Sequence, residues 1–241
     1  MFRLLKRPLL EHSREIKSPD GRISCKLELK FGKLIYSVKK DGKVVLRDSR
    51  LGFEIKGEAP IFDGLMIVRM HESSFDETWE RQWGEERYVR NNYNEVALYM
   101  SETSGDKRLF TVRFRIFDDG VAFRYEFPPQ PSFTSLIITD ELTEFNVDAN
   151  AKAWKIPAYQ PDRYEYNYER WPVDALIQSV HTPLTIETPL GDYISIHEAA
   201  LYDYGSVTLK LNKGELCRQI LRRCLTARRH MWICHLIHLG E

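Results

Sequence analysis

Hydrophobic and polar residues alternate with a period of two over much of this chain. The alternation first runs over residues 23–29 and resumes over residues 34–38. Asp41 and Gly42 then supply the residue types of a tight hairpin turn, and another alternating stretch follows at residues 44–46. This period places successive side chains on opposite faces of an extended strand, so the first part of the chain is predicted to consist of strands joined by turns.

The clearest predicted hairpin lies in the middle of the chain. Residues 110–116 and 121–127 alternate aromatic or β-branched residues with others, and an Asp-Asp-Gly turn at residues 118–120 separates them. Many short strands separated by turn signals are typical of a β-sandwich, and helix is expected to be scarce. Further strands are predicted at residues 96–100, 144–147, 151–156, 184–187, 193–197 and 207–211.

Composition sets broad limits on what the chain can be. It has 241 residues, 43% of them hydrophobic, which suffices for one large all-β domain or two small domains with a sizeable core. Basic and acidic residues balance at 35 each, so charge gives no reason to expect a nucleic acid or an anionic membrane as partner. Apolar runs of about eighteen residues do not occur, and no membrane span is expected.

The start of the chain differs from its body, residues 17–212. Residues 1–16 are of uncertain character, because basic residues and a proline interrupt the leucines and leave no apolar core for a signal peptide. As written, the chain is therefore not expected to be exported. The body holds a single cysteine, Cys25, so it cannot form an internal disulfide.

The tail, residues 213–241, is unlike the rest. It carries six basic residues against two acidic ones and three of the four cysteines. One interpretation is a basic amphipathic helix, since Leu216, Ile220, Leu221 and Leu225 have helical spacing with arginines opposite. The other is a frameshift near its start, because cysteine, arginine and histidine are enriched and a shifted back-translation permits a peptide that ends in Ser-Pro-Trp.

Two segments mix aromatic rings with charged and amide side chains in a way that fits no simple period. Residues 78–95 place two tryptophans and two tyrosines among arginines, asparagines and glutamates. Residues 159–171 hold four tyrosines and a tryptophan in a similar setting. Flat rings beside hydrogen-bonding groups suit a sugar or a domain interface. The alternative for each segment is an irregular loop packed on the sandwich.

A carboxylate stands out at the end of the strand predicted at residues 193–197. By alternation, Glu198 shares a face with Ile194 and Ile196, while His197 points to the other face. A carboxylate in register with two isoleucines needs a partner, and a hard cation such as calcium binds carboxylate oxygens. The alternative is a glutamate at a strand end that leaves the core.

No motif nominates a catalytic residue. The chain has no GxGxxG, phosphate loop, GxSxG or HExxH sequence. Its adjacent carboxylates, such as Glu85 with Glu86 and Asp118 with Asp119, would point to opposite faces of a strand and do not form an acid–base couple. No catalytic residue is therefore predicted within the chain.

Taken together, several segments resemble the N-terminal domain of glycoside hydrolase family 97, a family of α-glucosidases and α-galactosidases. The resemblance covers residues 17–212 and keeps the family's order and approximate spacing. One departure is Asn92, where the family pattern has histidine, and a second is the tail, where more β-structure would be expected. The matching segments are Ser-Pro-Asp-Gly at 18–21, Trp-Gly-Glu at 83–85, Arg-Asn and Tyr-Asn-Glu within 90–95, Asp-Gly-Val-Ala-Phe at 119–123 and Ile-His-Glu-Ala at 196–199.

The resemblance implies an all-β fold, a β-supersandwich like that of galactose mutarotase, which packs on a catalytic (β/α)8 barrel absent from this chain. It implies hydrolysis of α-glucosidic or α-galactosidic bonds in oligosaccharides by the parent enzyme, with this chain inactive by itself. Calcium is the implied cofactor and Glu198 one of its ligands, and the family is periplasmic or secreted. The candidates for substrate or domain-interface contacts are Trp83, Arg90, Asn91, Tyr93, Asn94 and His197.

Two other functions stay open at this point. A free sandwich that holds sugar through its aromatic segments would be a carbohydrate-binding module. A purely structural domain would support a barrel and expose an adhesive face without it. Tight sugar binding by the chain alone would favour the module, whereas the absence of any binding would favour the structural domain.

Overall fold

The computed structural model of the chain is almost entirely β-strand. It describes residues 11–133, 135–159, 165–202, 206–212, 215–219, 225–226 and 232–240. Within these residues the helical element is one short 3-10 turn, η1 (Val173–Ala175). The all-β fold class expected from the alternating pattern is confirmed. The described part of the chain has no helix of the length and apolar character that a membrane span needs.

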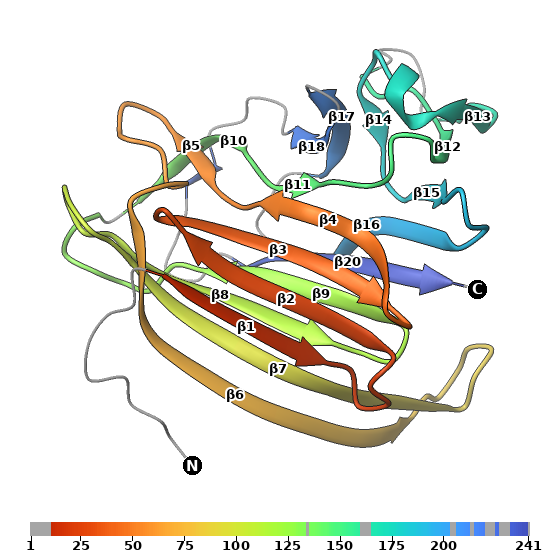
Figure 1. Ribbon diagram of the computed structural model, residues 1–241, viewed down its shortest axis with the longest axis horizontal. Helices are drawn as coiled ribbons and strands as arrows, with labels where there is room; N and C mark the ends of the chain where they lie inside the picture. Colours follow the sequence, from red (N-terminus) through yellow and green to blue (C-terminus); the bar gives the residue numbers. More distant parts are fainter. Residues whose placement is uncertain are drawn as a thin grey trace.

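The first strands form a four-stranded antiparallel sheet along one side of the molecule (Figure 1). The turn between its last two strands holds Asp41 and Gly42, both at positive φ (50° and 79°), as the predicted hairpin requires. The strand order follows the sequence: β1 (His12–Lys17), β2 (Ile23–Lys30), β3 (Lys33–Lys40) and β4 (Lys43–Arg50).

A nine-stranded antiparallel sheet forms the second layer. Its order is β13-β12-β15-β16-β20-β9-β8-β7-β6, so strands from the middle and the end of the chain lie side by side. The strands are β6 (Leu65–Glu80), β7 (Tyr88–Glu102), β8 (Leu109–Ile116), β9 (Gly120–Glu126), β12 (Lys152–Lys155), β13 (Glu169–Pro172), β15 (Leu184–Glu187), β16 (Tyr193–Tyr202) and β20 (Trp232–Gly240).

Two smaller sheets complete the fold. One has the order β19-β10-β5 and consists of β19 (Leu225–Thr226), β10 (Ile137–Glu141) and β5 (Phe53–Ile55). The other has the order β11-β18-β17-β14 and consists of β11 (Glu144–Phe145), β18 (Glu215–Gln219), β17 (Thr208–Asn212) and β14 (Val180–His181).

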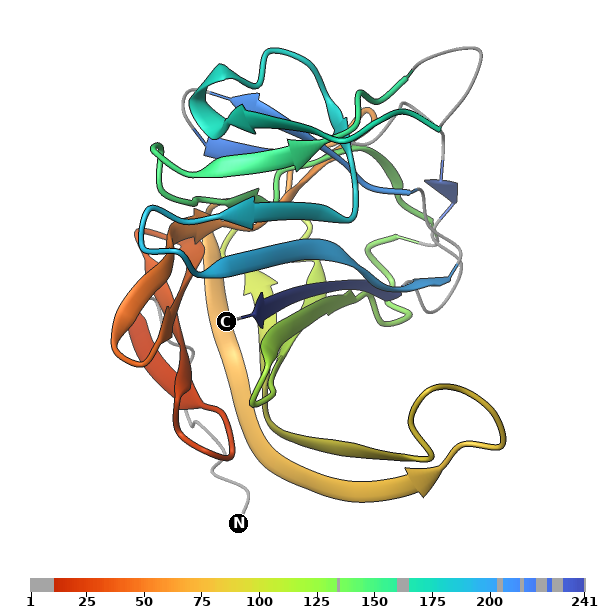
Figure 2. The same cartoon turned by 90° about the vertical axis from the view of Figure 1, so that its right-hand side faces the viewer.

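Much of the hydrophobic core lies between the first sheet and the β6–β9 part of the nine-stranded sheet, which face each other in Figure 2, and it continues along β12, β15 and β16. Tyr36 of β3 is fully buried there, with its ring 5.7 Å from that of Phe114 and 5.3 Å from that of Phe123. The alternating residues of the predicted β8–β9 hairpin supply the other side of this core. Two sheets packed through their alternating faces form the expected sandwich.

The sequence pattern located most of the strands but not all. Each stretch singled out for its alternation, from residues 23–29 to residues 207–211, contains a strand. The pattern missed β1, β5, β6, β10, β13, β14, β18, β19 and β20, many of which are very short. Of the longer ones, β1 and β6 have mixed polarity, and most of β6 is exposed on both faces. A strand without a buried face gives no alternating signal.

The structure changes two interpretations of local structure. The helix predicted from Leu216 to Leu225 is not formed, because Glu215–Gln219 is strand β18, which lies between β17 and β11, and Leu225–Thr226 pairs with β10. Residues 220–224 lie outside the described part. At residues 78–95, where an irregular loop was one of two interpretations, the ends of β6 and β7 pair as a regular antiparallel ribbon, and only the turn at residues 81–87 is irregular.

Candidate functional site

Glu198 lies in β16, near the centre of the nine-stranded sheet. The residues before it alternate as expected, with Ile194 and Ile196 buried and His197 half-buried. The pairing register of β16 with β20 shifts between Glu198 and Ala200. The regular strand is therefore interrupted where the carboxylate stands, and Glu198 itself is only half-buried.

Two groups from outside β16 bind the carboxylate of Glu198. The hydroxyl of Thr182 donates to Oε2 at 2.8 Å, and the backbone N–H of Val207 donates to Oε1 at 2.5 Å. Thr182 follows β14 and Val207 precedes β17, so the carboxylate connects the nine-stranded sheet to the β11-β18-β17-β14 sheet. These contacts fix its orientation. Nδ1 of His197 lies 3.1 Å from the carbonyl oxygen of Glu198.

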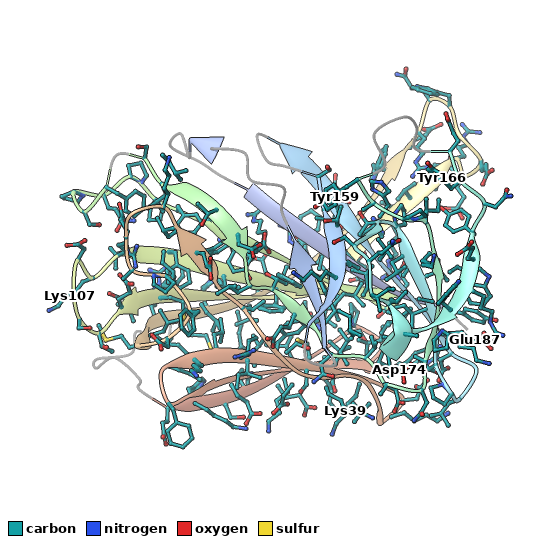
Figure 3. The ribbon with its side chains drawn as sticks, turned by 90° about the horizontal axis from the view of Figure 1, so that it is seen from above. Lys39, Lys107, Tyr159, Tyr166, Asp174 and Glu187 are labelled. Carbon is teal, nitrogen blue, oxygen red and sulfur yellow. The ribbon has the colours of Figure 1, made fainter. Side chains whose placement is uncertain are left out.

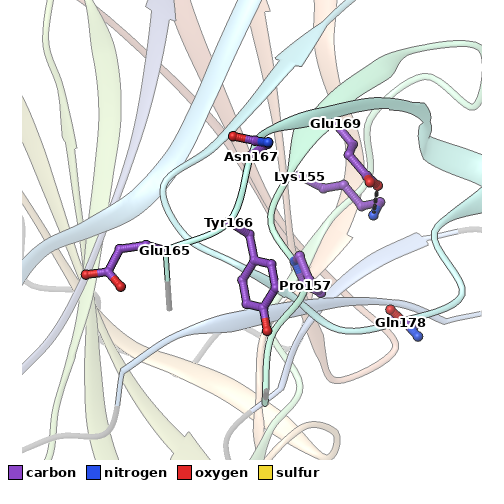
Figure 4. A pocket seen from close by; sticks show the side chains of 7 residues that line it. All are labelled: Lys155, Pro157, Glu165, Tyr166, Asn167, Glu169 and Gln178. Atoms are coloured by element: carbon purple, nitrogen blue, oxygen red, sulfur yellow. Dashed lines mark hydrogen bonds and ion pairs between the residues drawn. The ribbon is translucent and has the colours of Figure 1, made fainter. Parts of the chain in front are cut away.

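A polar pocket of about 670 Å³ opens in the same region (Figure 4). Its lining includes Pro157, which forms a β-bridge with Val180, two residues before Thr182. The pocket and the Glu198 carboxylate thus adjoin the same short strand, β14. Burial lowers the pKa of His181 in that strand, which favours its neutral form. The pocket is lined by Lys155, Pro157, Glu165, Tyr166, Asn167, Glu169 and Gln178.

The aromatic segment expected at residues 159–171 supplies much of this pocket and its surroundings. Tyr166 contributes its ring to the lining (Figures 3 and 4). Lys155 pairs with Glu169 at 2.6 Å and lies 5.0 Å from the ring centre of Trp171. Rings, amides and carboxylates around one hollow are the groups that recognise sugar hydroxyls and sugar faces. Residues 160–164 lie outside the described part.

The remaining candidates lie on the ribbon of β6 and β7, and most are engaged within it. Tyr93 is buried, with its ring stacked on that of Phe75 at 5.4 Å. The Asn94 amide donates to the carbonyl of Lys17 at 2.9 Å. Arg90 forms a bidentate pair with Asp76 at 2.9 and 2.7 Å, Asn91 is half-buried, and Trp83 is 87% exposed.

The structure therefore divides the candidates between two places. His197 and Glu198 lie on β16, whereas the other five lie on β7 and its turn. Three strands, β20, β9 and β8, stand between β16 and β7. Four interstrand spacings amount to about 19 Å. No sequence signal identified Lys155 and Gln178 as pocket residues, because separate segments bring them together only in the folded chain.

Glu198 fits calcium as one ligand among several. Each of its oxygens accepts one of the two hydrogen bonds described above, and a carboxylate oxygen has a further lone pair for a cation. Calcium takes six to eight oxygens, and the described residues hold no group of three or more His, Cys, Asp or Glu side chains that could bind a metal. A calcium ion at Glu198 would thus need most of its ligands from outside the described residues.

Comparison with known proteins places this site in context. Residues 16–230 match the family model for the glycosyl-hydrolase 97 N-terminal region. A family 97 glycoside hydrolase from Pseudoalteromonas sp. strain K8, solved with acarbose, is similar with a TM-score of 0.89 and 35% identity. The match covers 95% of this chain and 36% of that one, and a variant of that enzyme solved with panose matches equally well.

A more distant structure shares the fold alone. The β-arabinopyranosidase crystal structure has a TM-score of 0.80 at 19% identity, covering 94% of this chain and 40% of its own. In each case the chain spans well under half of the length of the solved enzyme.

Proposed function

The chain belongs to glycoside hydrolase family 97, as its N-terminal domain, and from this premise we propose that it serves an enzyme that hydrolyses α-glucosidic or α-galactosidic bonds in oligosaccharides. In this proposal the domain packs on a (β/α)8 barrel and contributes one calcium ligand, Glu198. The similar enzyme from Pseudoalteromonas was solved with two saccharide ligands, acarbose and panose, which supports an oligosaccharide as the substrate class.

The surroundings of the Glu198 carboxylate support its assignment as a calcium ligand. Its carboxylate is held by Thr182 and Val207 at an interruption of the central sheet, and Glu198 is half-buried and not inside the apolar core. Its partners among the described residues, a hydroxyl and a backbone N–H, carry no positive charge, so the carboxylate is held in place without being neutralised by them and is suited to a cation. When bound, calcium would supply positive charge and coordination positions for oxygen atoms of a sugar or water.

The role of the chain's own residues is to bind and orient. Thr182 and Val207 fix the Glu198 carboxylate, while the pocket offers Tyr166, Asn167 and Gln178 to sugar hydroxyls. Glycoside hydrolysis requires two carboxylates that flank the scissile bond. No such pair is assigned to this chain, because in the proposal the acid and its partner belong to the barrel.

Calorimetry and an activity assay test this function directly. The chain is titrated with calcium, alone and with maltose, and then assayed with p-nitrophenyl α-glucoside and α-galactoside. We expect weak calcium binding that Glu198→Gln removes and Glu187→Gln keeps, and no release of nitrophenol. Glu187 is a suitable control because it also lies in the nine-stranded sheet but pairs with Arg170. Turnover by this chain alone, or calcium binding unchanged by Glu198→Gln, would contradict the proposal.

A carbohydrate-binding module is the second candidate, and the pocket is the observation that favours it. Its lining combines a tyrosine ring with amide and carboxylate groups. In this case maltose binds the isolated chain tightly without calcium, and Tyr166→Ala abolishes the heat of binding while Phe31→Ala, on an exposed turn, retains it. A purely structural domain would give no heat with either ligand.

A further inference from the structure

The ribbon formed by residues 75–93, here called the arm, continues beyond the body of the nine-stranded sheet. β8 ends at Ile116, which pairs with Asn94, so from Tyr93 outward β7 pairs only with β6 among the described strands. Figure 2 shows the arm bending away from the other strands. An isolated two-stranded ribbon is marginally stable in water, so an arm of this length gains from a surface to lie on.

The base of the arm is rigidly packed. The Tyr93 ring stacks on Phe75 on one side, and the Arg115 guanidinium lies 4.3 Å from its centre. Phe117 packs against the same ring at 5.2 Å. The arm is therefore held in a defined direction, and it does not fold back over the sheet from which it comes (Figure 2).

Beyond this base the arm exposes large aromatic rings. Trp79, Trp83 and Tyr88 are all exposed. The guanidinium group of Arg81 lies 5.5 Å from the centre of the Trp79 ring, and that of Arg87 lies 5.4 Å from the centre of the Tyr88 ring. Each of these two rings therefore has an arginine beside it. Tryptophan, tyrosine and arginine together are the residues enriched at the centres of protein interfaces.

The arm and the sheet carry opposite charge. The arm has five carboxylates (Asp76, Glu77, Glu80, Glu85 and Glu86) and three arginines (Arg81, Arg87 and Arg90). On the side of β6–β9 opposite the core, here called the polar face, four arginines accompany two carboxylates. The pairing register places these six residues on one side of the sheet: Arg69, Arg113, Arg115, Arg124, Glu95 and Glu126.

The polar face is only partly neutralised by its own carboxylates. Glu95 binds Arg113 and Arg115, at 2.5 and 2.7 Å, and Glu126 binds Arg113 and Arg124, at 3.0 and 2.6 Å. Burial and the nearby charges of Arg113 and Arg115 lower the pKa of Arg124. Among the six residues that define the face, four arginines outnumber two carboxylates, which is complementary to the acidic arm.

We propose that the arm docks on the polar face of a second copy of this chain, giving a two-fold dimer in which each arm crosses to its partner. Both complementary surfaces lie on one chain, so a two-fold arrangement buries two arms and two faces at once. This proposal is independent of the role in glycoside hydrolysis.

Sedimentation velocity of the full chain over a wide range of concentration tests the dimer. We expect a monomer–dimer equilibrium that weakens as salt is raised, since salt screens exposed charges. Replacing both Trp79 and Tyr88 by alanine should raise the dissociation constant by roughly tenfold or more. Phe31→Ala, an equally exposed aromatic change on the β2–β3 turn, should leave the constant unchanged.

A charge reversal adds a second, independent measurement. Glu86→Lys in the exposed arm turn should weaken the dimer, whereas Asp106→Lys in the exposed β7–β8 turn should not. Circular dichroism confirms that each variant keeps its fold. A chain that stays monomeric at every concentration, or a dimer indifferent to both arm variants, would overturn the proposal.

Discussion

The phenol of Tyr36 donates a hydrogen bond of 2.6 Å to the backbone carbonyl of Glu144, 108 residues further along the chain. Both residues are buried. The same ring packs between Phe114 and Phe123 of the β8–β9 hairpin. One side chain therefore connects the first sheet, the nine-stranded sheet and β11, which precedes the segments that build the pocket.

Removal of this hydroxyl should destabilise the fold without creating a cavity. Tyr36→Phe keeps the ring contacts and deletes one buried hydrogen bond, so we expect a loss of about 1 kcal/mol in the free energy of unfolding. Urea denaturation measures the loss. Tyr88→Phe, on an exposed ring of the arm, serves as the control and should change the stability by less. Equal effects of the two substitutions would contradict the importance of the Tyr36–Glu144 bond.

A buried ion pair should contribute much more than an exposed one. Arg108 is 3% exposed and binds Glu102 and Glu58 through its guanidinium, with a further bond of 2.7 Å to the carbonyl of Ala59. Arg108→Met leaves the largely buried Glu102 carboxylate without its partner, and such losses amount to about 3–5 kcal/mol.

The matched control is Arg87→Met, which breaks the exposed Arg87–Glu80 pair of the arm. Exposed pairs contribute at most about 1 kcal/mol, because water and salt screen them. Urea denaturation of both variants compares the two pairs. Similar losses in the two variants would show that Glu102 finds another partner when Arg108 is absent.

The two aromatic segments show where sequence pattern is sufficient and where it is not. Alternation located β8 and β9 because one face of each strand is buried, and the positions of Phe114 and Phe123 in the core follow from it. Alternation did not predict the outer part of the β6–β7 ribbon, because Trp79 and Tyr88 lie where the ribbon is exposed on both faces. A ribbon of that kind has the composition of a loop and the backbone of a strand.

The tail and the candidate site show two other limits of the sequence pattern. Helical spacing of leucines predicted a helix, but the edge of β17 offered backbone partners, and Glu215–Gln219 pairs along it as a strand. Glu198 became a candidate because it shares a strand face with two isoleucines, and the family resemblance then implied that it is a calcium ligand. Its partners Thr182 and Val207, and the pocket residues Lys155 and Gln178, come from separate segments whose proximity depends on the three-dimensional pairing.

Acid should remove the contribution of Glu126 to stability. Burial alone would raise the pKa of this carboxyl. The hydrogen bonds and charges of Arg113 and Arg124 lower the pKa by more than burial raises it, so the pKa in the folded chain lies below the ordinary value of 4.5. The ionised group then stabilises the fold above the unfolded pKa, and that contribution disappears as the pH falls through the folded pKa.

The test is the difference in unfolding free energy between the native chain and Glu126→Gln across a pH series. We expect this difference to be constant near neutral pH and to shrink below about pH 4.5. Urea denaturation at each pH supplies both values. A difference that does not vary with pH would mean that the arginines do not hold Glu126 in its ionised form.

Two glycines have similar positive φ angles but different surroundings. A comparison of them distinguishes the cost of the backbone conformation from the cost of a steric collision. Gly21 and Gly32 both have positive φ, 78° and 73°. A Cβ at Gly21 would meet nothing within 4 Å, whereas at Gly32 it would lie 2.8 Å from the backbone nitrogen of Gly64. Gly64 immediately precedes Leu65, the first residue of β6, whose N–H donates to the Gly32 carbonyl at 2.9 Å. The β2–β3 turn therefore positions the start of β6 by direct backbone contact.

Alanine at each position should then give two different losses of stability. Gly21→Ala introduces only the left-handed conformation, at about 1–2 kcal/mol. Gly32→Ala adds a collision with backbone that has no side chain to move aside, and overpacking of this kind costs a further 1–3 kcal/mol or so. Urea denaturation of both variants gives the difference. If the two losses were equal, the turn would be free to move away from Gly64, and the close approach would not fix the start of β6.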